Sequence, residues 1–223
     1  MNKYLLPIYA VILGFIIAKV AKEKVNNIKL LLAFSGAFLL SLTVFDLLPE
    51  VYHHLDAKQT GLFIMLGILV QIFLEFFSKG AEHGHVHIHK HSKVFPWLLF
   101  ISLCLHSFLE GFPIHQHNDM VYGVLIHKIP IAILITTYLI QSDFKTRQII
   151  VFLTLFGIMT PLGTIISNNV ALASGYLDYI NAMVIGIFLH ISTTILFESS
   201  EGHKFNLTKI LVIVAAIGIA YFI

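Results

Sequence analysis

Long apolar runs separated by short polar stretches follow one another along the whole chain. Each run holds about 17 to 23 residues, close to the roughly 20 that an α-helix needs to cross a hydrocarbon core of about 30 Å. The runs lack the alternation of apolar and polar residues that is typical of a membrane β-strand. The pattern predicts an all-α, polytopic membrane protein, a bundle of eight transmembrane helices over residues 4–20, 28–49, 61–78, 94–113, 120–140, 148–170, 177–198 and 207–223.

Composition agrees with this pattern, since 57% of the 223 residues are hydrophobic and only 12% are charged. A water-soluble globule of this size needs more polar side chains to cover its surface. We therefore expect one transmembrane domain, residues 1–223, in a cell membrane, either a plasma membrane or a bacterial inner membrane. Cys104 is the only cysteine, which excludes an internal disulfide, and we expect it to be a small buried residue.

Lysine and arginine gather in alternate connections between the predicted helices. Cytoplasmic loops collect positive charge, so the charged side is predicted to be cytoplasmic and both termini extracytoplasmic. The formal net charge of +2 follows from this topology and gives no indication of a nucleic acid partner. The odd-numbered connections hold Lys19, Lys22, Lys24, Lys29, Lys79, Lys90, Lys93, Lys145, Arg147, Lys204 and Lys209, whereas the other side holds Lys3 and Lys58.

A polar break, Cys104-Leu-His-Ser-Phe-Leu-Glu-Gly111, interrupts the run over residues 94–113. His106 and Glu110 are four residues apart, which places them on one helix face about 6 Å apart along the axis. Ionisable groups at membrane depth are rare and indicate an ion or proton pathway. The alternative is a structural hydrogen-bonded pair that holds two helices together.

The next run contains a second break, His127-Lys-Ile-Pro130, in which proline frees a backbone carbonyl and bends the helix. If these two helices are antiparallel neighbours, His127 reaches nearly the depth of His106 and Glu110. Two imidazoles and a carboxylate suit a zinc-class ion, with ligand distances of about 2.0–2.2 Å. The sequence therefore predicts a metal site made by His106, Glu110 and His127.

Further polar residues suggest a route through the membrane. Asp46, near the external end of its helix, either receives an entering cation or is a carboxylate that reaches the interface, and the sequence leaves both open. Thr160, followed by Pro-Leu-Gly163, is a polar residue at mid-membrane. His190 is near the centre of its predicted helix, and Glu198, eight residues further on, lies roughly on the same face and closer to the cytoplasm. We expect the pathway to run from Asp46 through the central site to His190 and Glu198.

The connection over residues 79–93 carries alternating histidines. A flexible run of imidazoles supplies several metal ligands without a defined fold, so we expect a weak and promiscuous cytoplasmic acceptor. The alternative is a solvated loop that binds no metal. The residues are His83, His85, His87, His89 and His91.

At these residues the chain resembles the ZIP, or Zrt- and Irt-like, family of divalent metal transporters. Three segments carry the resemblance. Asp46-Leu-Leu-Pro-Glu50 ends the second predicted helix, His106-Ser-Phe-Leu-Glu110-Gly111 is similar to the family's His-Asn-x-x-acid-Gly, and His127-Lys-Ile-Pro130 is similar to its His-or-Gln, acid, x, Pro. The resemblance implies that divalent metal ions are transported as substrate, with no cofactor. It also implies that the metal is held between the fourth and fifth helices, often as a two-metal centre, and that the protein is a homodimer in the lipid bilayer.

Four residues depart from the family pattern at positions that hold the second metal. Ser107 replaces Asn, Lys128 an acid, Ile131 a Glu or His, and Thr160 a carboxylate. One metal is therefore expected, with Ser107, Lys128 and Thr160 filling the space beside it. We expect Lys128 to pair with Glu110 in place of the second cation, and the alternative is that it reaches toward the external vestibule.

The favoured function is uptake of a divalent transition-metal ion, most readily zinc, into the cytoplasm by a protein that is not an enzyme. One alternative is an intramembrane zinc hydrolase with Glu110 or Asp46 as general base, although the chain lacks His-Glu-x-x-His. Another is a metal-binding relative that does not transport, suggested by the lost carboxylates at Lys128 and Ile131.

Overall fold

The computed structural model describes residues 3–21, 28–78, 95–114, 119–142, 144–169, 174–198 and 207–223. Within these ranges the chain is helical and contains no strand, so the prediction of an all-α bundle is confirmed. The helices are η1 (Lys3–Leu5), α1 (Leu6–Val20), α2 (Ile28–Leu42), η2 (Thr43–Leu47), α3 (Leu48–His54), α4 (Ala57–Ser78), α5 (Trp97–Leu109), α6 (Met120–Gln141), α7 (Thr146–Asn169), α8 (Ser174–Glu198) and α9 (Leu207–Tyr221).

Five helical stretches are long and apolar enough to cross a membrane: Ile28–His54, Ala57–Ser78, Met120–Gln141, Thr146–Asn169 and Tyr176–Phe197. The first of them joins α2 and α3 through η2, a π-helical turn. Three shorter apolar helices, α1, α5 and α9, accompany them in the described part of the chain. These lengths support a multi-pass membrane protein, and the side on which each terminus lies stays a prediction.

Two helix ends differ from the predicted bounds for identifiable reasons. α4 begins at Ala57, earlier than residue 61, because Asp56 Oδ1 accepts hydrogen bonds from the backbone N–H groups of Lys58 and Gln59, at 3.0 and 3.2 Å. α5 ends at Leu109, before residue 113, and the chain then turns at Glu110 and Gly111. Glu110 therefore lies at the end of its helix.

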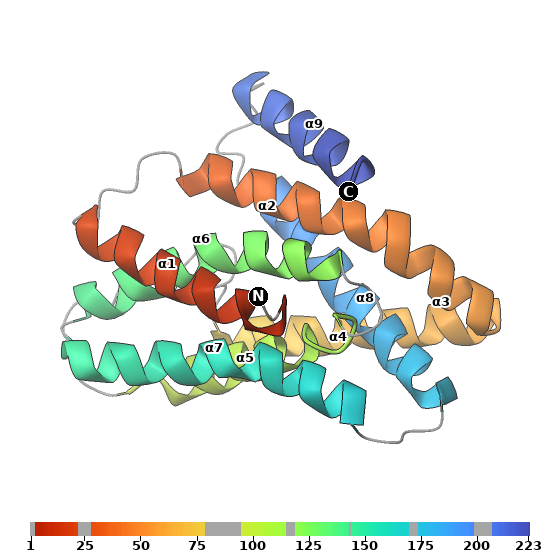
Figure 1. Cartoon of the computed structure of the whole chain (residues 1–223), viewed down its shortest axis with the longest axis horizontal. Helices are drawn as coiled ribbons and strands as arrows, with labels where there is room; N and C mark the ends of the chain where they lie inside the picture. Colours follow the sequence, from red (N-terminus) through yellow and green to blue (C-terminus); the bar gives the residue numbers. More distant parts are fainter. Residues whose placement is uncertain are drawn as a thin grey trace.

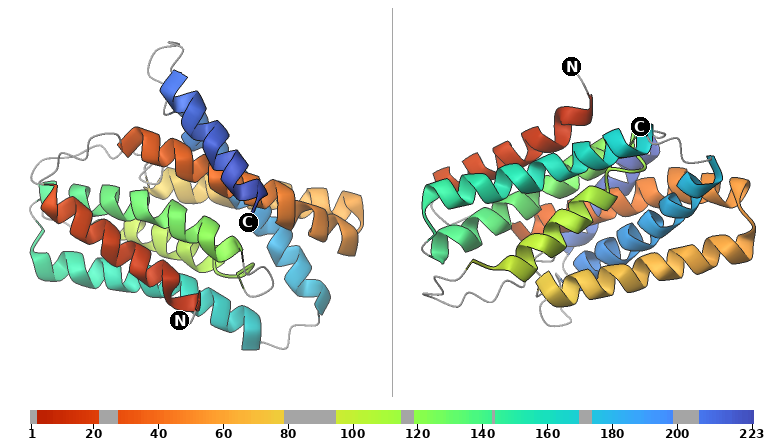
Figure 2. Two further views of the ribbon diagram at one scale, coloured as in Figure 1. Left: turned by 45° about the horizontal axis from the view of Figure 1, so that its top comes forward. Right: turned by 90° about the horizontal axis from the view of Figure 1, so that it is seen from below.

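The helices pack in two groups (Figure 1). In the first group α1 lies along α6 and α7, and α5 lies along α7. In the second group α4 lies along α8, while α2 contacts α8 and α9. The groups meet where α2 packs on α6 and where α4 packs on α5, and Figure 2 shows α9 on the outer side of α2.

Glycines bring helices of one group close together. A Cβ at Gly67 of α4 would run into the backbone of Met183 in α8, and one at Gly163 of α7 would run into the carbonyl of Phe108 in α5. The contact between the groups is looser at Gly123 of α6, where the atoms nearest to a Cβ would be in the side chains of Leu39 and Leu42, at 3.3 and 3.1 Å. Backbone contact thus stiffens each group, and leucine side chains separate the two at this point.

Candidate metal site

His106 and Glu110 contact each other as their spacing predicts. Glu110 is the C-cap residue of α5, and its N–H donates to the carbonyl of His106 at 3.0 Å. The His106 Nε2 atom lies 3.4 Å from Glu110 Oε2, and the side chains are 3% and 1% exposed. An imidazole and a carboxylate therefore lie together in the interior of the bundle.

His127 of α6 is close to this pair. Its ring centroid lies 6.1 Å from that of His106, with the two rings nearly perpendicular at 82°. Its side chain is buried. Within the described residues no group of three or more His, Cys, Asp or Glu side chains is arranged to hold a metal ion. The structure thus brings the three predicted ligands into one region, and the metal site itself stays a proposal.

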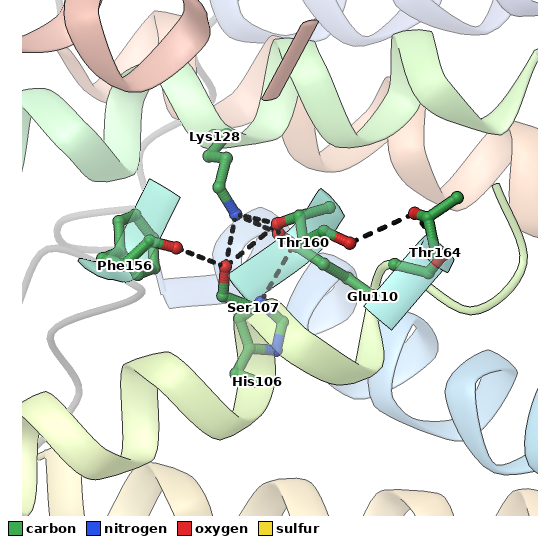
Figure 3. Close-up of polar contacts among 8 residues, drawn as sticks. His106, Ser107, Glu110, Lys128, Phe156, Thr160 and Thr164 are labelled. Carbon is green, nitrogen blue, oxygen red and sulfur yellow. Dashed lines mark hydrogen bonds and ion pairs between the residues drawn. The ribbon is translucent and has the colours of Figure 1, made fainter. Parts of the chain in front are cut away.

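Lys128 lies at the centre of the polar network beside Glu110 (Figure 3). Its ammonium donates to Glu110 Oε1 in an ion pair, and to Ser107 Oγ and Thr160 Oγ1 at 2.8 Å each. The lysine is 1% exposed, so it does not reach toward the surface. The predicted pairing of Lys128 with Glu110 agrees with this geometry, which excludes the alternative of a vestibule-facing lysine in this conformation.

The two hydroxyl groups complete a consistent set of hydrogen bonds. Thr160 donates to Glu110 Oε1 at 2.7 Å, and Ser107 donates to the carbonyl of Phe156 at 2.9 Å. Both hydroxyl oxygens then accept from the ammonium of Lys128, which uses all three of its N–H bonds. The Lys128 Nζ atom also lies 4.5 Å from the ring centroid of Phe156, a favourable cation–π distance. The ammonium of Lys128 thus contacts one carboxylate oxygen, two hydroxyl oxygens and one aromatic ring.

Contrary to the neighbouring arrangement considered from the sequence, α5 and α6 do not pack directly against each other along their length. In the described ranges α5 packs on α7 and α4, while α6 packs mainly on α1 and α2. Figure 3 shows that Thr160 of α7 bonds both to Lys128 of α6 and to Glu110 of α5. The reason is the small size of Gly111 and Gly163, which lets α5 and α7 touch through their backbones. The long side chain of Lys128 then bridges the remaining space.

Asp46 lies in the π-helical turn η2 and is exposed. It lines an open groove of about 650 Å³. The groove is formed by Phe45, Asp46, Pro49, Glu50, His53 and His54. Asp46 therefore lies beside other groups that attract cations.

His190 of α8 forms a pair that the sequence reasoning missed. Its Nε2 atom lies 2.6 Å from Glu75 Oε2 of α4, and the side chains are 20% and 25% exposed. Glu75 interrupts an apolar run in the sequence, so the rule that flags ionisable residues at membrane depth would have found it. The pairing itself, between residues 115 positions apart, has no signal in the sequence.

The remaining predicted groups fall outside the structural description. Residues 79–94, which include the histidines from His83 to His91, are not among the described residues. Glu198 is the last residue of α8, and its side chain is likewise outside the described part. Their predicted roles in metal handling stay predictions.

Comparison with known proteins relates the chain to metal transporters. The family model described as "ZIP Zinc transporter" matches residues 77–223. A protein named Zinc transporter ZIP1 from Danio rerio is 35% identical over 89 residues, which cover 37% of this chain and 30% of the relative. A second Zinc transporter ZIP1, from Takifugu rubripes, is 28% identical over 123 residues, or 50% of this chain and 41% of the relative. The chain thus matches less than half the length of either curated relative.

The family match begins near the end of α4 and extends to the last residue of the chain. It includes the helices that carry His106, Glu110, His127, Lys128 and Thr160. Since the match covers most of the chain and contains this buried polar network, the chain belongs to the ZIP zinc transporter family.

Proposed function

We propose that this protein carries divalent transition-metal ions, with zinc as the main substrate, across its membrane into the cytoplasm. The observation that carries the proposal is the buried contact between His106 and Glu110, with the ring of His127 beside it. Membership of the ZIP zinc transporter family and the names of the two relatives support the same activity. Imidazole and carboxylate together form a ligand set that suits zinc.

In this proposal one metal ion binds between His106, His127 and the Oε2 atom of Glu110. Oε1 of Glu110 already accepts from Lys128 and Thr160, which leaves Oε2 as the oxygen on the histidine side. The ion would take the place of the contact between His106 and Glu110, with modest movements of three side chains. Donor atoms at about 2.0–2.2 Å from the ion are the expected result.

Lys128 acts in this proposal as a permanent positive charge beside the metal. A lone carboxylate in the interior is costly, and the ammonium offsets that cost without occupying the histidine side. Three of the positions that depart from the family pattern, Ser107, Lys128 and Thr160, contact each other directly. The hydroxyl groups of Ser107 and Thr160 are suited to bind an ammonium, whereas carboxylates at these positions would attract a second metal ion.

Movement of one helix group against the other is the mechanism we favour. The group of α1, α5, α6 and α7 carries the whole central network, and its helices touch through glycines. The group of α2, α4, α8 and α9 contains Gly67 and Gly186, which join α4 to α8 in the same way. A stiff group that slides past leucine side chains such as Leu39 and Leu42 can expose its site to each side in turn.

Two flanking positions extend the proposed route. Asp46, in its open external groove, attracts the cation before it reaches the central site. The pair of Glu75 and His190 offers ligands that an ion can meet before it reaches Glu198 and the histidine-rich connection on the predicted cytoplasmic side. A homodimer is part of the proposal through the family resemblance, and cross-linking of copies in the membrane would test it.

Reconstitution into liposomes tests this function. We expect purified protein to admit zinc down an imposed gradient, with competition from other divalent transition metals. All three N–H bonds of the Lys128 ammonium already have acceptors, which favours a second candidate function. In that function the protein binds metal but does not transport it. Metal binding without flux would support that candidate and overturn the transport proposal.

A further inference from the structure

One face of α7 carries three hydroxyl side chains, those of Thr160, Thr164 and Ser167. Spacings of four and three residues place side chains next to one another along a helix. All three are buried, with exposed fractions of 0%, 2% and 4%. A buried hydroxyl is costly unless it is hydrogen-bonded, so its acceptor indicates what it holds in place.

Two of these hydroxyls bond to the chain directly after Glu110. Thr164 donates to the carbonyl of Gly111 at 2.8 Å (Figure 3). Ser167 donates to the carbonyl of Phe112 at 3.1 Å. The Thr164 hydroxyl also lies 3.1 Å from the carbonyl four residues earlier in α7, the usual acceptor of a helical threonine, so its shorter contact is the one to the other segment.

The turn after α5 depends on donors from outside its own helix. Pro113 has no backbone N–H and disfavours a helical conformation at Phe112, so α5 cannot continue. Carbonyl groups at such a helix end have no partner within the helix. Residues 111–114 are buried, and buried carbonyl groups need a donor. Thr164 and Ser167 supply donors where a continued helix would have supplied backbone N–H groups.

Glu110 has a regular helix on only one side. Its N–H donates to the carbonyl of His106 at 3.0 Å, which ties it to α5. On its other side the chain is held through Gly111 and Phe112 by α7. The place of this turn determines which carboxylate oxygen faces which partner, with Oε1 on the ammonium of Lys128 and Oε2 3.4 Å from His106 Nε2.

We propose that Thr164 and Ser167 are positioning residues for Glu110, which hold its Oε2 atom on the side of the two histidines. They act through the main chain of the turn and do not themselves bind the metal ion. Ligands of a binding site must be held within about 0.5 Å of their productive arrangement, so a looser turn weakens the site. The effect on metal affinity rests on the proposed function, whereas the hold on the turn does not.

Matched variants separate this role from the ordinary loss of a buried hydroxyl. Thr164→Val keeps the branched shape and removes the donor, and Thr164→Ser keeps the donor and tests for rescue. Ser167→Ala removes the second donor independently. Ser41→Ala is the control, because Ser41 is also buried but donates to the carbonyl of Ala37 in its own helix, at 2.8 Å. The unfolding temperature of each variant in detergent shows whether it is folded.

Hydrogen–deuterium exchange of the full-length protein tests the hold on the turn without metal or flux. The amides of residues 110–112 bond back to α5 at 3.0–3.2 Å, so they report on movement of this turn. We expect these amides to exchange at least fivefold faster in Thr164→Val and in Ser167→Ala, and at the wild-type rate in Thr164→Ser and Ser41→Ala. Unchanged exchange in both donor-removing variants would overturn the proposal.

Bound Co²⁺ tests the link to the metal site, because its visible absorption reports the arrangement of its ligands. The spectrum of His106→Ala protein is subtracted, so that only the central site is observed. We expect Thr164→Val and Ser167→Ala to bind Co²⁺ about tenfold more weakly and with an altered spectrum, as for other partners that orient a metal ligand. Wild-type affinity and spectrum in both variants, or a wild-type protein whose spectrum does not depend on His106, would overturn the link.

Zinc uptake by the same proteins in liposomes separates this proposal from the proposed function. A raised half-saturating zinc concentration in Thr164→Val, with rescue in Thr164→Ser and little change in the maximal rate, supports both. If the wild type moves zinc and both donor-removing variants keep its half-saturating concentration, the positioning role fails and transport stands. If the wild type moves no zinc while its Co²⁺ spectrum responds to the variants as expected, transport fails and the positioning role stands.

Discussion

Lys128 and Glu110 form an ion pair between α6 and α5 in which each side chain is only 1% exposed. The ammonium also holds Ser107 and Thr160, so a single positive charge connects three helices. Neither charge is stable at this depth alone, because an isolated buried ion loses its hydration without compensation. The ion pair with Lys128 therefore allows Glu110 to keep its negative charge beside His106.

Removing the lysine should expose this dependence. Lys128→Met leaves the Glu110 carboxylate without its cation, and breaking a buried pair in this way costs about 3–5 kcal/mol. We expect a lower unfolding temperature and a zinc uptake rate reduced at least tenfold, or an altered preference among metal ions. Lys58→Met, which changes an exposed lysine in α4, should behave like the wild type in both measurements.

The double variant Lys128→Met with Glu110→Gln separates stability from function. A neutral pair carries no unbalanced charge, so the unfolding temperature should recover toward that of the wild type, while zinc uptake should stay low. Thermal unfolding in detergent and uptake by vesicles measure the two effects. Recovery of uptake in the double variant would show that Glu110 is not a metal ligand.

Restoring acids at two departing positions should create a second metal site. Lys128→Asp combined with Thr160→Glu removes the ammonium and adds two carboxylates next to Glu110, where the family pattern has acidic residues. We expect the number of zinc ions bound per chain at the buried site to rise from one to two, as measured by equilibrium dialysis in a background without residues 83–91. A stoichiometry that stays at one would contradict the view that Lys128 replaces a cation.

Uptake should depend on external pH through the histidines. An imidazole must be neutral to bind a metal ion, so protons compete with the metal as the pH falls. Zinc uptake should therefore fall steeply as the external pH is lowered and the ligand histidines take up protons. Rates measured with a fixed internal pH test this, and a flat or rising profile on acidification would instead indicate proton-coupled transport.

The histidine-rich connection should change rates and leave selectivity intact. Deletion of residues 83–91 removes a run of imidazole ligands on the predicted cytoplasmic side, whereas the proposed central site is built from residues of the membrane-spanning helices. We expect the deletion variant to keep its metal preference and to differ in the rate of release into the vesicle lumen or in its response to accumulated metal. Loss of metal binding at the central site would contradict this role.

Local sequence patterns anticipated much of the fold and part of the site. Apolar runs gave the positions of the helices because each helix must cover a hydrocarbon core, and the four-residue spacing of His106 and Glu110 gave their contact. The pairing of Lys128 with Glu110 followed from the high cost of a buried lysine without a partner. These inferences needed only local geometry and the energetics of charge in an apolar medium.

Long-range packing was beyond the same reasoning. The contact of Thr160 with both Lys128 and Glu110 depends on α7 packing against α5 through Gly111 and Gly163, and a sequence does not state which helices touch. The contact of Glu75 with His190 likewise joins residues 115 positions apart. Such contacts depend on how all the helices of the bundle are arranged, and no single apolar run in the sequence determines that arrangement.

Zinc flux into liposomes that contain purified protein tests the central claim most directly, with His106→Ala as the site variant and Lys58→Ala, an exposed residue of α4 outside the proposed route, as its control. We expect zinc uptake by the wild type, a rate lowered at least tenfold in His106→Ala, and a change of less than threefold in Lys58→Ala. Folding of each variant is checked by its unfolding temperature. No uptake of zinc, manganese, iron or cadmium by the wild type, or full zinc uptake by folded His106→Ala protein, would contradict it.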